Sequence, residues 1–312
     1  MKRSQFVAVT GAALAAQARP ARAAGATIRL GSSPVEEWAI PYYATQKGFF
    51  RDAGLNVEVS NFPGGGFVTQ AVLGGALDVG LTNSGSMAAA HVRGLPLYLL
   101  ASGPIYTVKA PIAHLIVGKN SPINDATALA GKTIGVTTLN DMVQAAAMSW
   151  IDHRGVDSHS AKWFELRSSE MAPALEVGRI DAAVIVEPTN TSIKDRVKAI
   201  GLPYEAVNNG KPFQTGGAIG NKLWVDQNGD LARRLTAVLL HTADWAGKNP
   251  DEVSAMLAQM TKMDVAIVSS IPRVTYATKN DLGLVQPVID VIARYGFIPK
   301  PFPAAELRAP GA

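Results

Sequence analysis

Apolar positions along this chain alternate between short strand-like runs and helical stretches, and the order of these segments repeats about a hundred residues later. Each copy has a strand, a helix ending at a glycine, a second strand, and a short helix leading into Gly, any residue, a branched apolar residue and Asp. The paired segments are Thr27–Leu30 and Thr133–Val136, Gly54 and Gly155, Val57–Ser60 and Trp163–Leu166, and Gly75–Asp78 and Gly178–Asp181. Two such βαβαβ units predict two α/β lobes that face each other and enclose a small molecule.

Segments outside the repeat extend this picture. Apolar runs at Leu77–Leu81, Leu97–Ser102 and His114–Val117 predict further strands, and Phe213–Leu223 predicts an extended return segment. Three- and four-residue apolar spacing predicts tail helices at Leu231–Ala246 and Asp251–Met260. Because this tail has no counterpart in the second half, we expect lobe one to comprise residues 27–112 and 220–312, with lobe two, residues 113–219, inserted between them.

Residues 1–24 have the layout of a secretory signal peptide. Lys2-Arg3 precedes an apolar run over Phe6–Ala16, and Ala21-Arg22-Ala23 is an Ala-x-Ala cleavage pattern. The run is shorter than the roughly 20 apolar residues that a membrane span requires. Twin-arginine and general secretory export both remain open. We expect a periplasmic protein that is soluble once the leader is removed.

Removing the leader changes the charge balance. The leader holds four basic residues and no acid, so 29 − 4 = 25 basic residues remain against 25 acidic ones. A near-neutral chain gives no reason to expect nucleic-acid binding, which usually needs a basic face. Zero cysteines exclude disulfides, thiolate metal sites, a cysteine nucleophile and a lipid on an N-terminal cysteine. We expect a monomer without metal or cofactor.

The candidate site follows from the predicted sheets, because ligands of open parallel α/β sheets bind beyond the carboxyl ends of the strands. The loops at these ends are Ser32–Trp38, Pro63–Phe67 and Thr82–Ser86 in lobe one, and Thr137–Asp141, Arg167–Glu170 and Glu187–Asn190 in lobe two. The candidate ligand-binding residues are Ser33, Glu37, Trp38, Gly64, Gly65, Gly66, Asn83, Ser84, Thr137, Thr138, Asn140, Asp141, Ser168 and Glu187.

Several of these segments permit more than one interpretation. Glu36 and Glu37 beside Trp38 can grip a cation or an amino-bearing ring, or can be two solvated carboxylates next to a surface indole. The glycines 64–66 allow close backbone approach or form an ordinary flexible turn. The loop Thr137–Asp141 can cap a helix and still leave N–H groups for an anion.

Carboxylates at strand ends have different expected roles. Glu187 ends a buried strand, where an unpaired carboxylate is costly, so we expect it to meet the ligand or a hinge partner. Asp78 and Asp181 occupy matched positions of the repeat and are expected to bind local backbone amides. The sequence shows no nucleophile elbow and no serine–histidine–carboxylate constellation, which argues against an enzyme.

The chain resembles the solute-binding proteins of ABC importers of the nitrate/taurine/sulfonate type, which are related to pyrimidine-precursor binding proteins. Its matching segments are Ala44-x-x-Lys47-Gly48-Phe49-Phe50, Gly54-Leu55-x-Val57-x-Val59, Gly64-Gly65, Ala71-x-x-Gly74-x-x-Leu77-Asp78, Leu129-x-Gly131-Lys132-x-Ile134-Gly135-Val136, Ala174-Leu175-x-x-Gly178-x-Ile180-Asp181-Ala182, Glu187-Pro188 and Asn249-Pro250. Together these segments cover nearly the whole chain after the leader.

The resemblance implies a two-lobed type II periplasmic-binding-protein fold, with mostly parallel sheets and two crossover strands. It also implies a small organic solute trapped between the lobes and delivered to an ABC permease driven by an ATPase. Carboxylates at Glu36, Glu37 and Glu187 favour a zwitterion or a nitrogen heterocycle over a bare inorganic anion. The alternatives are an enzyme of the same fold acting on a pyrimidine-like compound, which the absence of cysteine disfavours, and the input domain of a sensor.

Overall fold

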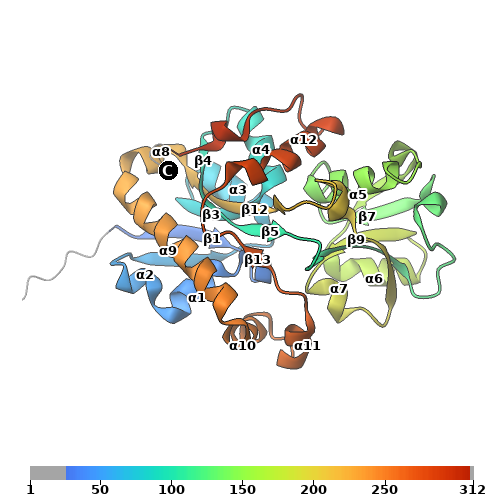
Figure 1. The fold of residues 1–312 in the computed structure, drawn as a ribbon, viewed down its shortest axis with the longest axis horizontal. Helices are drawn as coiled ribbons and strands as arrows, with labels where there is room; N and C mark the ends of the chain where they lie inside the picture. Colours follow the sequence, from blue (N-terminus) through green and yellow to red (C-terminus); the bar gives the residue numbers. More distant parts are fainter. Residues whose placement is uncertain (1–25, 310–312) are drawn as a thin grey trace, which may run out of the picture.

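The computed structural model describes residues 26–309, so the expected leader, residues 1–24, lies outside the described part. Within that part, the strands form two five-stranded sheets and one three-stranded sheet. The two larger sheets lie in separate lobes, at the left and right of Figure 1, with the small sheet between them. The expected two-lobed α/β architecture is therefore confirmed.

Lobe one is built on a sheet with the strand order β2-β1-β3-β12-β4. Its strands are β1 (Ile28–Ser32), β2 (Val57–Asn61), β3 (Val79–Asn83), β4 (Leu97–Ser102) and β12 (Gly216–Asn221). β1 runs parallel to β2 and β3, whereas β12 runs antiparallel to both β3 and β4. One strand of this sheet therefore returns against the others.

Lobe two repeats this plan in the order β8-β7-β9-β6-β10. Its strands are β6 (Ala113–Gly118), β7 (Thr133–Val136), β8 (Lys162–Glu165), β9 (Ala182–Val186) and β10 (Val197–Gly201). β7 is parallel to β8 and β9, and β6 is antiparallel to β9 and β10. In lobe one the reversed strand comes after the repeat unit, and in lobe two it comes before it.

Glycines at matched positions of the two repeats share a left-handed backbone. Gly54 and Gly155, which end the first helical stretch of each unit, have φ angles of 68° and 78°. Gly75 and Gly178, before the repeated Asp, have φ angles of 74° and 70°. Residues with a Cβ rarely adopt this conformation, so the glycines of the repeat are required by the turns they make.

The repeated aspartates accept from backbone N–H groups of the first strand of their own repeat unit, as predicted. Asp78 Oδ2 accepts a hydrogen bond of 2.8 Å from the backbone N–H of Arg29. Asp181 Oδ2 accepts one of the same length from the backbone N–H of Thr133. Both aspartates thus fasten the strand that carries them to the neighbouring strand, and their role is structural.

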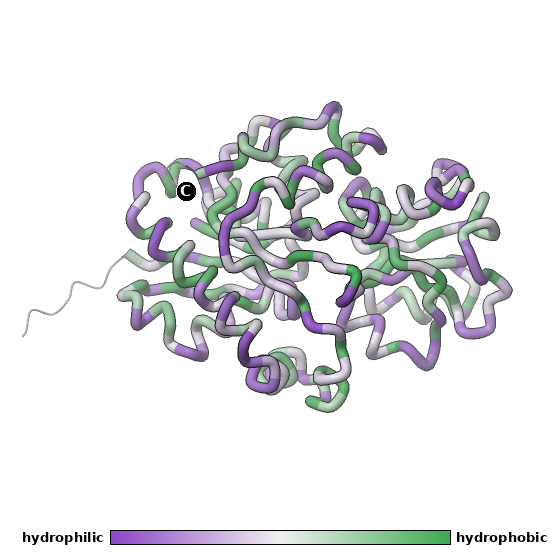
Figure 2. Tube along the Cα trace, viewed as in Figure 1, coloured by the Kyte–Doolittle hydropathy of each residue, from purple (hydrophilic) through white to green (hydrophobic). Residues whose placement is uncertain are grey.

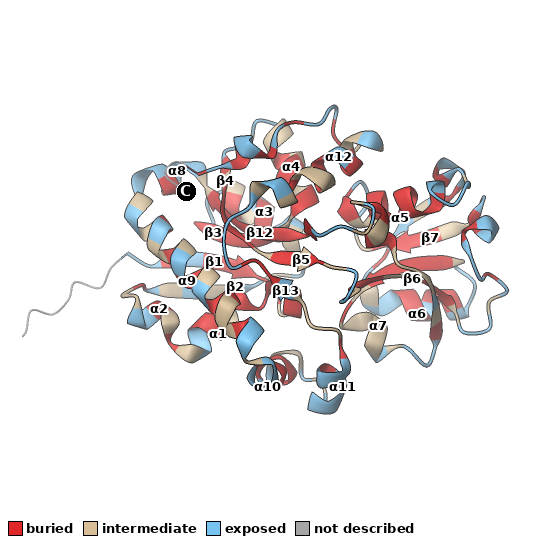
Figure 3. Ribbon diagram, viewed as in Figure 1, coloured by how far each residue is buried: buried red, intermediate tan, exposed pale blue. Residues whose placement is uncertain are grey.

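Helices cover both faces of each sheet. They are α1 (Ile40–Lys47), α2 (Phe49–Asp52), α3 (Gly65–Leu73), α4 (Ser84–Val92), α5 (Met142–Asp152), α6 (Ser168–Glu176), α7 (Thr189–Ser192), α8 (Lys222–Gln227), α9 (Gly229–Lys248), α10 (Pro250–Thr261), α11 (Val265–Ser270) and α12 (Gln286–Arg294). Figure 2 shows apolar residues concentrated along the strands of lobe two, and Figure 3 shows the central strands buried while the outer helix faces are exposed. Each lobe therefore has an apolar core on both sides of its sheet.

Crossover segments connect the lobes and form the small sheet. β5 (Pro104–Tyr106) pairs with β11 (Phe213–Gln214) and with β13 (Thr275–Tyr276). β5 and β11 lie on the two segments that run between the sheets, which confirms the expected pair of crossover strands. The division into residues 27–112 with 220–312 and 113–219 stays a prediction, and its second boundary falls within β12.

Helix α5 of lobe two packs into the core of lobe one. Its residues Met142, Ala145 and Ala146 share an apolar cluster with Val288 and Ile289 of α12. At the far end of the helix, the hydroxyl of Tyr295 donates to Asp152 Oδ2 at 2.6 Å. The lobes are therefore joined by a packed helix as well as by the crossover segments.

Two predicted element boundaries are wrong for local reasons. Leu77, the first residue of the predicted strand Leu77–Leu81, lies outside β3, which begins at Val79. The N–H of Leu77 donates instead to the carbonyl of Ala71 and closes the turn after α3. The return segment ends at Asn221, whose side chain accepts from the N–H of Trp224 and begins α8. Asparagine is a preferred helix N-cap, so this second boundary follows from ordinary capping.

Candidate functional site

The loop after β1 is buried. Glu36, Glu37 and Trp38 form a short 3-10 helix, and their exposed fractions are 4%, 7% and 8%. The alternative of two solvated carboxylates beside a surface indole is therefore wrong. Ser33, at the start of this loop, is also buried, and its hydroxyl has no hydrogen-bond partner within residues 26–309. Four polar or amphipathic side chains are thus withdrawn from water at one strand end.

Glu36 is held by the segment before and within β13. The guanidinium Nη1 of Arg273 donates to Glu36 Oε1 at 3.0 Å, and the hydroxyl of Tyr276 donates to the backbone carbonyl of Glu36. Burial raises the pKa of Glu36, and the charge of Arg273 opposes that effect. Arg273 lies 237 residues from Glu36 in the sequence, and no spacing pattern marks it as a partner.

Glu37 has weaker support than its neighbour. Its Oε1 accepts one hydrogen bond, from the hydroxyl of Thr215, at the long distance of 3.3 Å. Burial raises the pKa of Glu37 to about 7, and the adjacent charge of Glu36 adds to the increase while Thr215 opposes it. An acceptor that is buried and weakly bonded favours a ligand that brings an N–H group.

Trp38 is positioned by a glycine on the return crossover. A Cβ at Gly216 would lie 2.3 Å from the indole of Trp38 and equally close to the carbonyl oxygen of Thr82. The backbone therefore passes directly against the ring, which only glycine allows. The hydroxyl of Ser32 donates to the carbonyl of Trp38 at 2.6 Å and fixes the same residue from the strand side.

The glycines 64–66 begin α3 beside the same strand end. Gly64 and Gly66 face open space, whereas a Cβ at Gly65 would lie 2.8 Å from Thr82 Oγ1. The carbonyl of Gly65 accepts hydrogen bonds from Thr69 and Thr82, so the turn is anchored to β3. α3 has no side-chain cap, and the free N–H groups of its first turn suit an anionic group.

Asn83 and Ser84 at the end of β3 differ in their availability. Asn83 caps α4 by accepting from the N–H of Ser86, and its Nδ2 donates to Asp141 Oδ2 at 2.9 Å. Ser84 is fully buried, and its hydroxyl donates to the backbone carbonyl of Gln214 at 2.9 Å. Ser84 therefore supports the crossover, while Asn83 joins the two lobes.

On lobe two, the loop after β7 has an inner and an outer part. Asp141 is buried, caps α5 through the N–H of Met142 and binds Asn83. Burial raises the pKa of Asp141, and these two hydrogen bonds oppose the increase. Thr137 is half-buried, whereas Thr138 and Asn140 are exposed.

Two further features of lobe two complete the set of predicted residues. The N–H of Asn140, whose φ is 57°, donates to Gln144 Oε1 at 2.7 Å. Ser168 is half-buried at the first position of α6, where Glu170 already accepts from the N–H of Arg167. The N–H of Arg167, the residue before α6, is thus bonded to Glu170, while the first turn of α6, like that of α3, has no side-chain cap.

Glu187 is bonded by its own turn. Its two oxygens accept from Asn190 Nδ2 and from the backbone N–H of Thr191, each at 3.0 Å, and His114 Nε2 lies 3.4 Å from Oε1. Burial would raise the pKa of Glu187, but the bonds from His114, Asn190 and Thr191 outweigh it and lower the pKa. Glu187 therefore carries its charge inside the protein.

Contacts and charges show which candidate residues converge. The hydrogen bond between Asn83 and Asp141 joins the strand ends of the two lobes, and the charge of Glu187 acts on Glu36 by raising its pKa. Tyr204 lies between the lobes. Burial raises the pKa of Tyr204, and the charges of Glu37 and Asp141 raise it further. We call this region the interlobe site; the members that only the structure reveals are His114, Tyr204, Thr215 and Arg273, while Asn190 belongs to the predicted loop Glu187–Asn190.

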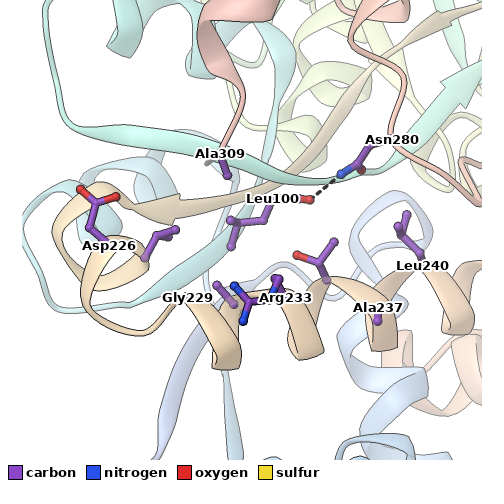
Figure 4. Close-up of a pocket in the computed structure, with 11 residues that line it drawn as sticks. Leu100, Asp226, Gly229, Arg233, Ala237, Leu240, Asn280 and Ala309 are labelled. Carbon is purple, nitrogen blue, oxygen red and sulfur yellow. Dashed lines mark hydrogen bonds between the residues drawn. The ribbon is translucent and has the colours of Figure 1, made fainter. Parts of the chain in front are cut away.

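Two pockets lie elsewhere, on either side of α9 in lobe one. The first, of about 470 Å³, is shown in Figure 4 and is lined by Leu100, Val225, Asp226, Gly229, Ala232, Arg233, Thr236, Ala237, Leu240, Asn280 and Ala309. Its wall is mostly carbon, and Asn280 is already bonded to the carbonyl of Leu100. The second is a shallower surface hollow beside Phe49 and His241. Neither receives a residue from lobe two, and neither is lined by a predicted ligand-binding residue, so the placement of the site between the lobes stays a prediction.

The described residues offer few groups for metal chemistry. Over residues 26–309, no group of three or more His, Asp or Glu side chains is arranged to hold a metal ion.

In the same range, no helix is both long and apolar enough to cross a membrane.

Residues 36–253 match the protein family described as NMT1/THI5 like. This match covers more than half of the chain. The protein belongs to the NMT1/THI5-like family.

Named relatives agree with this assignment. A Brucella abortus protein, named as a binding protein, is 26% identical over 277 residues, covering 85% of this chain and 81% of its own. The formylaminopyrimidine-binding protein of Halalkalibacterium halodurans is 22% identical over 228 residues, covering 72% of this chain and 66% of its own.

Solved structures show the same fold at low sequence identity. The alkanesulfonate-binding protein of Xanthomonas axonopodis pv. citri superposes with a TM-score of 0.76 at 15% identity, covering 91% of this chain and 98% of that one. The periplasmic nitrate-binding protein of Synechocystis gives 0.70 at 14% identity, covering 90% and 84%. The fold is that of the periplasmic binding proteins, as the resemblance implied.

Proposed function

We propose that this protein is the extracytoplasmic solute-binding component of an ABC importer. It would trap a small organic solute between its lobes and deliver it to a membrane permease and, through it, to an ATPase. The family, the fold and relatives named for the binding of an alkanesulfonate, nitrate and a formylaminopyrimidine support this class. Named relatives are binding proteins, which favours binding over catalysis.

The solute we propose bears an N–H or cationic group, as in an amino-sulfonate zwitterion or an aminopyrimidine. The observation that carries this choice is Glu37, a buried carboxyl with one hydrogen bond of 3.3 Å. An N–H donor from the solute would satisfy this acceptor, and an anionic group would suit the uncapped first turn of α3 at Gly64–Gly66. Trp38 would flank the solute between these two points, since Gly216 lies against both Trp38 and Thr82, and Gly65 lies against Thr82.

Matched solute pairs test this proposal by calorimetry. Taurine should bind more tightly than ethanesulfonate, or 4-aminopyrimidine more tightly than pyrimidine, by about 10- to 100-fold, the value of one charge-assisted hydrogen bond. Glu37→Gln should remove most of that difference, whereas Glu58→Gln, on the exposed face of β2, should preserve it. Equal affinity for both members of each pair in the wild type would contradict the proposed solute class.

Two further measurements test the transport role. Recovery of the solute chemically unchanged after incubation distinguishes binding from turnover by an enzyme of the same fold. Sequencing the N-terminus of the exported protein should place the mature start at Ala24 or within about two residues of it. An exported product that retains residues 1–20 would contradict the expected leader.

A further inference from the structure

Arg273, between α11 and β13, forms hydrogen bonds in three directions. Besides Glu36, it reaches the hydroxyl of Ser254 in α10 at 2.8 Å and the carbonyl of Val268 in α11 at 2.7 Å. A guanidinium is a planar fork with fixed donor directions, so three acceptors fix its orientation. α10 and α11, at the lower edge of lobe one in Figure 1, thus hold Arg273 against the loop after β1.

This link acts on one of two adjacent carboxylates. Glu36 and Glu37 are both buried, and each charge disfavours the other. Arg273 binds Glu36 and opposes the effect of burial there, while Glu37 receives only the long bond from Thr215. The pair is therefore asymmetric: one carboxylate is neutralised inside the protein, and the other is left short of donors.

We propose that Arg273 is a positioning residue that sets how many carboxylates the loop presents to the solute. By binding Glu36, it leaves Glu37 as the carboxylate of this pair that meets an N–H group. The site then matches a solute with one such group at that point. This inference rests on the proposed function, and it adds a residue that selects solutes by the number of their cationic groups.

The first test needs no solute. Carboxyl NMR titration of the protein should show that Arg273→Met raises the titration midpoint of Glu36 by about one pH unit or more, because an opposite charge has been removed. Arg273→Lys should give a smaller increase, and Arg93→Met, an exposed control on lobe one, should give none. An unchanged Glu36 midpoint in Arg273→Met would overturn the inference, whatever the solute proves to be.

The second test uses butylamine and putrescine, which differ by one amino group. Arg273→Met should raise the affinity ratio of putrescine to butylamine about tenfold, because Glu36 becomes available to the second amine. Simple structural damage would lower both affinities and leave the ratio unchanged, and that outcome would overturn the selection role. If neither amine binds the wild type while the Glu36 midpoint still shifts, the selection role is overturned and only the electrostatic role of Arg273 stands.

Discussion

Glu37 and Glu187 occupy facing lobes at the interlobe site and are equally buried, with 7% of each residue exposed. Their pKa values nevertheless move in opposite directions, upward to about 7 for Glu37 and downward for Glu187. Glu187 has donors from Asn190 and Thr191, with His114 Nε2 at 3.4 Å, whereas Glu37 has one long bond from Thr215. The depth of burial and the number and strength of the donors therefore act together to set the charge of an acid.

Because of this difference, Glu187 and Glu37 have different roles in the interlobe site. Glu187 is an anion that its own turn has already satisfied, so it contributes negative potential to the interlobe site without needing a ligand. Glu37 lacks donors, so a ligand that supplies an N–H donor gains more binding free energy at Glu37 than at Glu187. The same reasoning separates α3, whose first turn has no side-chain cap, from α5, whose first N–H is bonded to Asp141.

The largest expected effect is the loss of the carboxylate at Glu187. Glu187→Ala leaves the N–H of Thr191, the amide of Asn190 and the ring of His114 without their acceptor. Unfolding free energy should fall by about 3–5 kcal/mol at pH 7, measured by urea denaturation. Glu58→Ala is the exposed control. A loss below about 1 kcal/mol would mean that the donors around Glu187 are not responsible for its lowered pKa.

Glu37→Gln should have the opposite sign. A carboxyl whose pKa is raised from 4.5 to about 7 on folding contributes stability at low pH, and that contribution is lost as pH rises between these values. The Glu37→Gln variant does not lose this stability as pH rises, because glutamine does not ionise. At pH 8 it should be more stable than the wild type by up to about 3 kcal/mol, with little difference near pH 4.

Unfolding measured across this pH range checks the sign for Glu37. A variant that is less stable than the wild type at pH 8 would break the comparison, because it would show that the charged form of Glu37 is well supported. Such a result would also remove the main reason to expect an N–H donor from the solute.

A smaller change at Asn190 sharpens the comparison. Asn190→Ala removes one donor from Glu187, should cost about 1 kcal/mol at pH 7, and should move the pKa of Glu187 upward. A lowered pKa gives stability that is lost as pH falls below the ordinary value, so the variant should lose less stability on acidification than the wild type. An identical acid dependence in both proteins would exclude Asn190 as a cause of the lowered pKa.

Local sequence features determined much of the fold. The strands Thr133–Val136 and Leu97–Ser102 lie where the apolar pattern placed them. Gly54 and Gly155 end their helical stretches with left-handed backbones, and Asp78 and Asp181 bind the predicted kind of backbone amide. These features were predictable because helix stops, turns and strand periodicity depend on neighbours close in the chain.

The loops at the strand ends were predictable, the state of their side chains was not, and their role in binding a solute stays a prediction. The rule for strand ends selected Glu37, Trp38, Asn83 and Glu187, and the structure puts these residues at or near the junction of the lobes. Arg273, Thr215 and Tyr204 were missed because they reach the site from distant crossover and tail segments that carry no local signal. The sequence also did not show which polar groups are free to bind a ligand, because tertiary hydrogen bonds occupy those of Ser84 and Asp141.

The sequence by itself determined two similar α/β units, their turns and the loops at their strand ends, because each depends on short-range periodicity and backbone geometry. Tertiary structure alone decided which carboxylates are charged, which N–H groups are free and which helix joins the lobes. A pKa depends on burial and on donors within a few ångströms, and folding can bring those donors from anywhere in the chain. Glu36 and Glu37 are neighbours in sequence, yet a residue 237 positions away makes them different.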